Sequence, residues 1–305
     1  MKLSSNDRSQ NKFLSYIKPK RWFFRWQHIE EGFFKLLMMV SLFVVAGSLG
    51  IILWTVISKG IPGMSLAMLT QTPKGGFYLG KEGGILNAII GSFYLAMGGT
   101  FLAFIVSLPV TLYLELYASQ SKISGLIRLT LDVMWGIPSI VYGAFGFIVM
   151  LALGVRASLL AGILVLAVLE LPIMVRAIDE VMRVVPRDLE EASFAVGATR
   201  FETAIKVIIR QILPAIVTAV LLAFGRGIGD AASVLFTAGY TDRIPGSLFS
   251  PAASLPLAVF FQLGTPFPEV QKRAYASAMV LTIIILIVSL SSRWLSARLS
   301  RYSIK

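Results

Sequence analysis

Long uncharged stretches dominate the chain and predict helices that cross a membrane. Four runs contain no charged residue: 36–58, 83–114, 133–155 and 274–292. A helix needs about 20 mainly apolar residues to cross about 30 Å of hydrocarbon, so each run predicts one span. Two further apolar segments enclose isolated charges: Glu170 and Arg176 in 157–181, and Arg226 and Asp230 in 212–240. The pattern therefore predicts an all-α, polytopic membrane protein with six transmembrane helices.

A seventh uncharged run, 244–268, is not expected to span, because it contains five prolines and irregular backbone is not tolerated against lipid. We expect an external loop with a short helix lying over the bundle. The predicted order of parts is a basic cytoplasmic arm (1–32), a first transmembrane helix (33–58), an external linker (59–82) and a core of five helices (83–300).

Composition supports the membrane assignment. The chain is 56% hydrophobic and only 14% charged, whereas soluble domains carry about 25% charged residues. Its net charge of +12 does not indicate nucleic-acid binding, because 20 of the 28 Lys and Arg fall in the predicted cytoplasmic segments and 7 in the external ones. This is the positive-inside bias, and it places both termini in the cytoplasm. The absence of cysteine excludes disulfides and thiolate metal sites.

The longest predicted cytoplasmic loop, 186–214, has the pattern of two amphipathic helices. Pro186 and the acidic residues that follow it are typical of a helix start, and Gly197 interrupts the pattern. The second helix runs into the membrane at Leu213-Pro214. Such a loop is either a solvated loop with an apolar face or a docking surface for a cytoplasmic partner. The small residues around Gly197 favour docking, because they permit close backbone approach.

This loop resembles the EAA loop of ABC importer permeases. The matching residues are Glu-Ala-Ser-Phe-Ala-Val-Gly-Ala-Thr at 191–199 and Gln-Ile-Leu-Pro-Ala-Ile at 211–216. Ser193 stands where the family pattern has its second alanine, and Arg210 stands where many members have the first of two prolines.

Three other segments are similar to parts of that family: the first to the entry of its permease core, the second to the third span of its phosphate-specific members, and the third to the fifth span of their A-type permease subunit. They are Gly-Gly-Ile-Leu-Asn-Ala-Ile-Ile-Gly-Ser at 83–92, Trp-Gly-Ile-Pro-Ser-Ile-Val-Tyr-Gly at 135–143, and Gly-Arg-Gly-Ile-Gly-Asp-Ala-Ala-Ser-Val-Leu-Phe-Thr-Ala-Gly at 225–239. Asp230 replaces the glutamate common in that subunit, and Ser233 lies where a proline is common.

The resemblance implies a type I ABC importer permease in the bacterial plasma (inner) membrane, carrying inorganic phosphate. It implies three kinds of partner: a related C-type permease subunit, a dimer of ATPase subunits and an external phosphate-binding protein. ATP and Mg would be bound by the ATPase, with no cofactor, metal or catalytic residue on this chain. The residues implied to couple the chain to the ATPase are Glu190, Glu191, Ala192, Ser193, Gly197, Ala198, Thr199 and Arg200.

Arg226 and Asp230 are the first candidates for a substrate pathway. They are four residues apart, so on a continuous helix they would share one face and could pair. A charge at the bilayer centre costs about 2.5–3.5 kcal/mol on insertion scales, so both should face the bundle interior or a water-filled path. One interpretation is an ion pair that only locks the helix. In the other, Arg226 meets passing phosphate and Asp230 balances its charge.

Glu170 and Arg176 are further pathway candidates. Arg176 either lines the inner mouth of the pathway or extends to the cytoplasmic boundary, and Glu170 either faces the pathway or pairs with a neighbouring helix. Helix bends are expected at Pro138, Pro172 and Pro214.

Two features look like chemistry but are given other interpretations. Asp179 and Glu180 resemble a carboxylate pair, but neighbouring arginines indicate a solvated charged face. Residues 75–82 imitate the start of a phosphate-binding loop but lack its Ser or Thr, so ATP dependence must come from another polypeptide. Three alternatives remain at this stage: a molybdate or sulfate permease, an ion-coupled secondary transporter and a purely structural membrane subunit.

Overall fold

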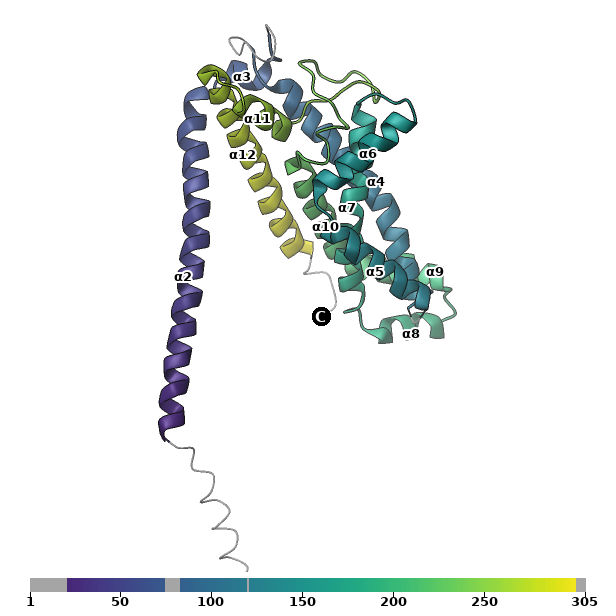
Figure 1. Ribbon diagram of the computed structural model, residues 1–305. Coiled ribbons are helices and arrows are strands. Elements are labelled where there is room, and N and C mark those ends of the chain that lie inside the picture. The colour runs from purple at the N-terminus through teal and green to yellow at the C-terminus, as the bar shows by residue number, and fades with distance from the viewer. Residues whose placement is uncertain (1–20, 75–82, 120, 300–305) are drawn as a thin grey trace, which may run out of the picture. The chain divides into compact units, whose positions relative to one another are not determined.

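The computed structural model describes residues 21–74, 83–119 and 121–299 (Figure 1). The first part of the predicted arm and the 75–82 segment lie outside the described residues. Contacts divide the chain into two units, 1–55 and 56–305, which are described separately.

The first unit is represented by the helix α2 (Arg21–Gly60) as far as Thr55. The apolar part of this helix is long enough to cross a membrane. Two hydroxyls within its apolar part are satisfied inside the helix: those of Ser41 and Ser48 donate to the carbonyls of Leu37 and Val45, both at 2.9 Å. Internal hydrogen bonding of this kind is what hydrocarbon requires of a spanning segment.

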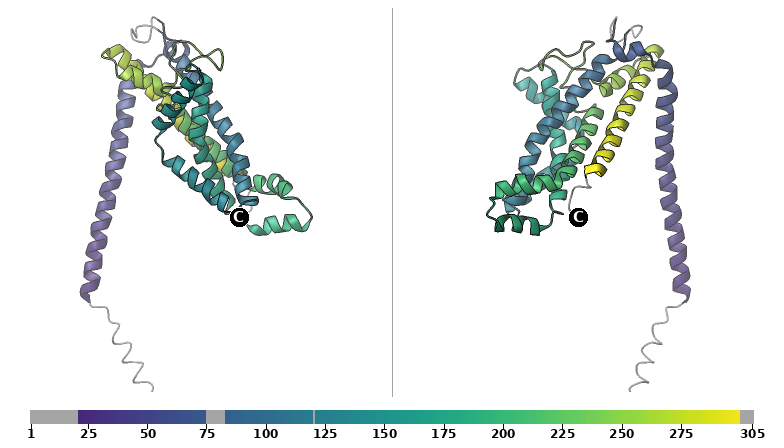
Figure 2. Two further views of the ribbon diagram at one scale, coloured as in Figure 1. Left: turned by 45° about the vertical axis from the view of Figure 1, so that its right-hand side comes forward. Right: turned by 180° about the vertical axis from the view of Figure 1, so that it is seen from behind.

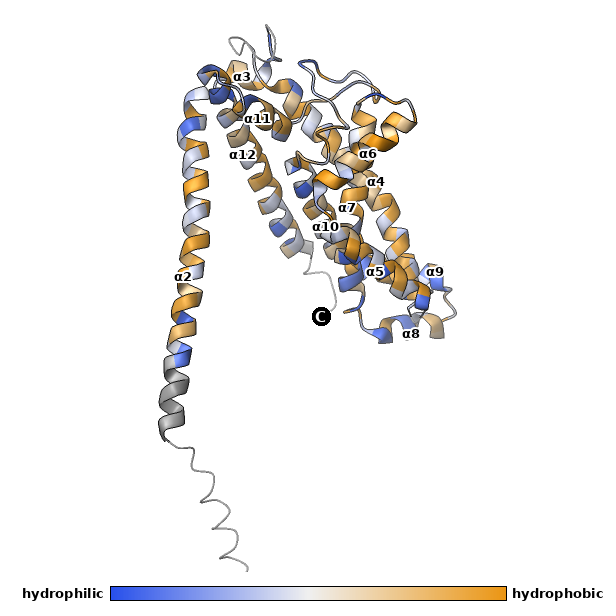
Figure 3. Cartoon of the chain, viewed as in Figure 1, coloured by the Kyte–Doolittle hydropathy of each residue, from blue (hydrophilic) through white to orange (hydrophobic). Residues whose placement is uncertain are grey.

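The second unit is a helical bundle in which α4 packs along α7, and α10 packs against α4, α7 and α12 (Figures 1 and 2). The bounds of these four helices are α4 (Leu86–Leu116), α7 (Leu159–Met182), α10 (Ile209–Gly229) and α12 (Pro268–Leu299). Apolar residues predominate along all four (Figure 3). Small residues let the pairs approach: a Cβ at Gly99 would lie 2.8 Å from the Cβ of Leu166 on α7.

The third span, predicted from the uncharged run 133–155, is not a single helix, and the bend expected at Pro138 is present. Two helices occupy this stretch, α5 (Lys122–Gly136) and α6 (Ser139–Ala152), and they are inclined at 102° to each other. Pro138 stands at the N-cap of α6, and Ile137 before it has ψ 128°, an extended conformation favoured for a residue before proline. The described residues therefore contain five candidate spans, or six if this bent pair is one span.

The expected fifth span is also shorter than its apolar run. α10 ends at Gly229 instead of continuing to Tyr240, and turns and irregular chain follow. The predicted short helix in the 244–268 loop is present as α11 (Leu255–Leu263). One face of α11, with Leu255, Leu257 and Ala258, is fully buried against the bundle, whereas Phe260 and Leu263 are exposed.

The predicted two-helix loop lies between α7 and α10. It contains α8 (Arg187–Ala195), α9 (Arg200–Thr203) and one π-helical turn, η2 (Ala204–Ile208), which leads directly into α10. We call residues 186–214 the coupling loop and the end of the bundle that carries it the coupling end. At the opposite end lie the short helices η1 (Ile61–Gly63) and α3 (Leu66–Thr70) (Figure 1).

Candidate functional site

A groove of about 680 Å³ lies among α5, α7, α10 and α12. Most of its lining is apolar, with three charged side chains among the lining residues, two of them arginines. The lining residues are Trp135, Ile173, Leu221, Leu222, Gly225, Arg226, Gly229, Asp230, Ile285, Ser289, Ser292 and Arg293. The groove is thus mostly apolar, and its charged lining residues have a net positive charge.

Arg226 presents its guanidinium to this groove from the last turn of α10. The side chain is exposed, and among the described residues no carboxylate or hydrogen-bond acceptor contacts it. Gly225 and Gly229 beside it add no side chain to the wall. A planar guanidinium with free donors is suited to the oxygens of a phosphate or another oxyanion.

Asp230 lines the same groove but does not pair with Arg226. α10 ends at Gly229, so Asp230 is the C-cap with an extended backbone (φ −83°, ψ 123°). Its Oδ2 accepts the backbone N–H of Ser233 at 2.8 Å. Of the two interpretations, the ion pair that locks the helix is therefore wrong, because it assumed that the helix continues through Asp230. Arg226 is left free for another anion.

Glu170 does not line the groove. It is fully buried between α4, α7 and α10, and its Oε2 accepts the hydroxyl of Thr100 on α4 at 2.8 Å. Its Oε1 has no hydrogen-bond partner and lies against Gly227, where a Cβ would be only 2.0 Å away. Of the two interpretations given above, the structure favours contact with neighbouring helices.

Arg176 forms an ion pair with Asp132 of α5. Arg176 follows Ile173 on α7 by one turn, and Asp132 precedes Trp135 on α5 by one turn, and both of these neighbours line the groove. The pair therefore lies beside the groove, toward the coupling end. The Nε of Arg176 is buried and has no hydrogen-bond partner among the described residues, so one donor of its guanidinium group is unused.

The coupling loop presents α8 as an exposed helix. Glu191, Ala192 and Ala195 are exposed, and the side chain of Val196 after them is 85% exposed. α8 ends where Gly197 adopts φ +84°, the left-handed conformation that favours glycine, and the N–H of Ala198 donates to the carbonyl of Ser193 at 3.2 Å. The turn at 197–199 is thus confirmed.

Buried and capping contacts fix the shape of this loop. The hydroxyls of Ser193 and Thr203 lie 2.8 Å apart and are buried, joining α8 to α9. Thr199 caps α9, with a reciprocal hydrogen bond from its N–H to Glu202 at 3.1 Å. Nη1 of Arg200 donates to the carbonyl of Leu116 at the end of α4 at 2.9 Å. These contacts hold the coupling loop in one defined conformation.

The three predicted bend residues occupy different settings. Pro138 lies at the break between α5 and α6, whereas Pro172 and Pro214 lie inside the continuous helices α7 and α10. The hydroxyl of Thr218 donates to the carbonyl of Pro214 at 2.8 Å.

Sequence reasoning missed Asp132 and Arg128 and misplaced Asp179. Asp179 is not on a solvated face: it is 2% exposed and pairs with Arg128 of α5 as well as with Arg183. The pairing with Arg183, four residues along α7, was readable from the sequence. The pairing with Arg128 joins residues 51 positions apart, and no local pattern indicates it.

The chain is similar to a family of membrane transport proteins and to individual members of it. Residues 107–302 match the family model described as binding-protein-dependent transport system inner membrane component. The phosphate transport system permease protein PstA of Xylella fastidiosa is 35% identical over 80% of this chain and 84% of the relative. PstA of Haemophilus influenzae is 32% identical over 79% and 85% of the two chains.

A solved structure has the same fold. A chain of the MetNI methionine ABC transporter, in inward-facing conformations, superposes with a TM-score of 0.58 over 70% of this chain and 95% of its own length. The two sequences are 19% identical, so this likeness concerns the arrangement of helices alone.

Proposed function

Since this chain belongs to the family of inner membrane components of binding-protein-dependent transport systems, we propose that it is the permease subunit of an ATP-driven importer of inorganic phosphate. The observation that carries the proposal is the groove at the end of α10, where the Arg226 guanidinium is exposed and has no ion-pair partner within the described part of the chain. The names of the PstA relatives support phosphate as the anion.

Transport by such a subunit requires partners. A second, C-type permease would complete the pathway, because the groove is open to the surface of this chain. An external phosphate-binding protein would deliver the substrate, and an ATPase dimer would bind ATP and Mg. In this arrangement both termini of the chain are cytoplasmic, and the chain itself catalyses no reaction.

In the groove, Arg226 would bind the phosphate in transit. Two N–H groups of a guanidinium can meet two phosphate oxygens in parallel, a geometry that is stronger and more directional than a point charge. Asp230 is engaged with Ser233 N–H, so its carboxylate limits the net positive charge without neutralising Arg226 directly. Such a site attracts phosphate without retaining it.

The coupling loop would dock in the ATPase. Ala192 and Ala195 of α8 are exposed, and their small side chains would allow the ATPase to approach the helix backbone closely. In this proposal, closure of the ATPase dimer moves α8, and the movement passes to α10 through α9 and η2, which are continuous with it.

Uptake by the assembled importer tests the proposal. Purified complex in proteoliposomes, with ATP on the ATPase side and loaded binding protein on the other, should accumulate labelled phosphate. Arg226→Ala should reduce that uptake at least tenfold. Arg298→Ala is the control, because Arg298 lies over the ring of Trp294, 5.1 Å from its centroid, and is not a groove residue.

Other outcomes separate the alternatives. ATP-driven accumulation of sulfate or molybdate but not phosphate would keep the transporter class and reject phosphate. Uptake driven by an ion gradient without ATP would reject the proposal altogether. Normal uptake by the Arg226→Ala complex would remove Arg226 from the pathway.

A further inference from the structure

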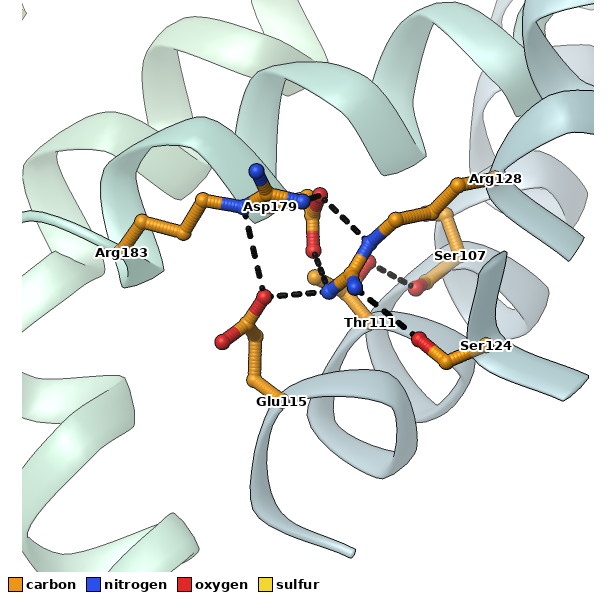
Figure 4. A network of polar contacts seen from close by, with 7 residues as sticks. All are labelled: Ser107, Thr111, Glu115, Ser124, Arg128, Asp179 and Arg183. Carbon is orange, nitrogen blue, oxygen red and sulfur yellow. Dashed lines mark hydrogen bonds and ion pairs between the residues drawn. The ribbon is translucent and has the colours of Figure 1, made fainter. Parts of the chain in front are cut away.

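Four charged side chains meet at the coupling end, where α4, α5 and α7 come together (Figure 4). They are Glu115, Arg128, Asp179 and Arg183, which we call the coupling-end ion cluster. Arg128 donates from Nε and Nη2 to Oδ2 and Oδ1 of Asp179 at 3.2 and 3.0 Å, and the same Nη2 contacts Oε1 of Glu115. One guanidinium therefore joins all three helices.

The cluster is enclosed rather than spread on the surface. The side chains of Arg128, Glu115 and Asp179 are 18%, 19% and 3% exposed. Nη1 of Arg128 donates to the buried hydroxyl of Ser124 at 2.9 Å, which fixes the plane of the guanidinium. Enclosed charges of this kind depend strongly on their partners, unlike exposed ion pairs.

The cluster is also connected to the coupling loop on both sides of α8. Before α8, Arg183 contacts Asp179 at 3.0 Å and Glu115 at 3.4 Å. After α8, Arg200 donates to the carbonyl of Leu116, the residue next to Glu115. Both flanks of α8 are thus attached to the last turn of α4.

We propose that the coupling-end ion cluster transmits movement of the coupling loop to α4, α5 and α7, with Arg128 as its positioning residue. The proposal rests on the proposed function, because it assigns a role in the coupling of ATP hydrolysis to transport. Glu115 and Asp179 share one nitrogen of Arg128, so without that nitrogen two carboxylates face each other. Arg183, whose side chain is 49% exposed, is then the sole cation of the cluster. Repulsion would separate α4 from α7 and release the flanks of α8.

The test measures phosphate transported per ATP hydrolysed in the reconstituted importer. Arg128→Ala should lower this ratio at least tenfold while ATP hydrolysis persists. Arg128→Lys restores a cation and should recover part of the ratio. Arg128→Ala with Glu115→Gln removes the repulsion and should recover more than Arg128→Ala alone. Lys272→Ala is the control, because it removes an exposed pair with Glu269 at the start of α12 and should leave the ratio unchanged.

Amide hydrogen exchange over 187–195 provides a readout that does not depend on the substrate. Exchange should be at least tenfold faster in Arg128→Ala than in the native chain. A native complex that fails to carry phosphate would refute the proposed function, and the exchange rates would still test the cluster. If Arg128→Ala transports as much phosphate per ATP as the native complex, and its amide hydrogens over 187–195 exchange at the native rate, the inference is overturned.

Assembly gives the remaining outcome. If Arg128→Ala fails to assemble but the double variant assembles, repulsion between the carboxylates is the cause and the inference stands. If both fail equally, Arg128 is needed for folding alone and the inference is wrong.

Discussion

Replacing Gly227 by alanine would measure how tightly α10 packs on α7. A Cβ at this position would lie 2.0 Å from Oε1 and 3.2 Å from the carboxyl carbon of Glu170. Glu170 is fully buried, and its other oxygen holds the hydroxyl of Thr100 at 2.8 Å. The carboxyl group can therefore move only by losing that hydrogen bond, and the overlap that remains pushes α10 away.

Three contributions set the size of the effect. Loss of the buried hydrogen bond is worth about 1–3 kcal/mol. Overpacking of a close helix contact adds about 1–3 kcal/mol. Alanine in place of glycine within a helix recovers about 1 kcal/mol. Gly227→Ala should therefore lower the free energy of unfolding by about 1–5 kcal/mol.

The assay is reversible unfolding in mixed micelles with increasing SDS, with Gly225→Ala as the matched control. Gly225 lies on the same helix, and the nearest atom to its Cβ would be Cγ1 of Val288 at an ordinary 3.8 Å. Gly225→Ala should be neutral or slightly stabilising. In a Glu170→Ala background the penalty at Gly227 should largely disappear. Equal effects at the two glycines, or an unchanged penalty without Glu170, would refute the reasoning.

Three further predictions concern the coupling loop and the groove. Gly197→Val should weaken ATPase binding more than tenfold in a pull-down. Gly154→Val is the control and should leave binding intact, because Gly154 also has a positive φ (+66°) and open surroundings but lies outside the coupling loop. Thr199→Ala should destabilise the chain by about 1 kcal/mol through loss of the α9 cap, measured by the same SDS unfolding. Asp132→Asn should free Arg176 and slow the release of phosphate on the cytoplasmic side. The maximal uptake rate should then fall, and half-saturation should occur at a lower phosphate concentration. An unchanged rate would contradict a role for this pair.

Much of the fold follows from local patterns in the sequence. Runs of about 20 apolar residues mark helices because hydrocarbon leaves a backbone no other partner for its hydrogen bonds. Residues 83–114 and 157–181 accordingly match α4 and α7 within a few residues. The coupling loop was also predictable, because amphipathic spacing and a single glycine specify two helices and the turn between them.

The end of α10 was not predictable in the same way. The apolar run continues to Tyr240, so hydropathy alone extends the helix. What ends it is the extended backbone at Asp230, stabilised by the hydrogen bond from Ser233 N–H, a local competition between side chain and helix that aspartate favours. Because the helix stops there, a spacing of four residues no longer implies an ion pair between Arg226 and Asp230.

The division of the third span shows why charge counting misplaced the boundary. Arg128 and Asp132 precede the uncharged run 133–155, so the predicted third span left them out, since a charge is costly in hydrocarbon. Both instead belong to α5 and pair with residues of α7, Arg128 with Asp179 and Asp132 with Arg176. A hydropathy window sees each charge but not its partner on another helix. The signal that remained was Pro138, because the residue before a proline is disfavoured in a helix, and the break between α5 and α6 lies at that point.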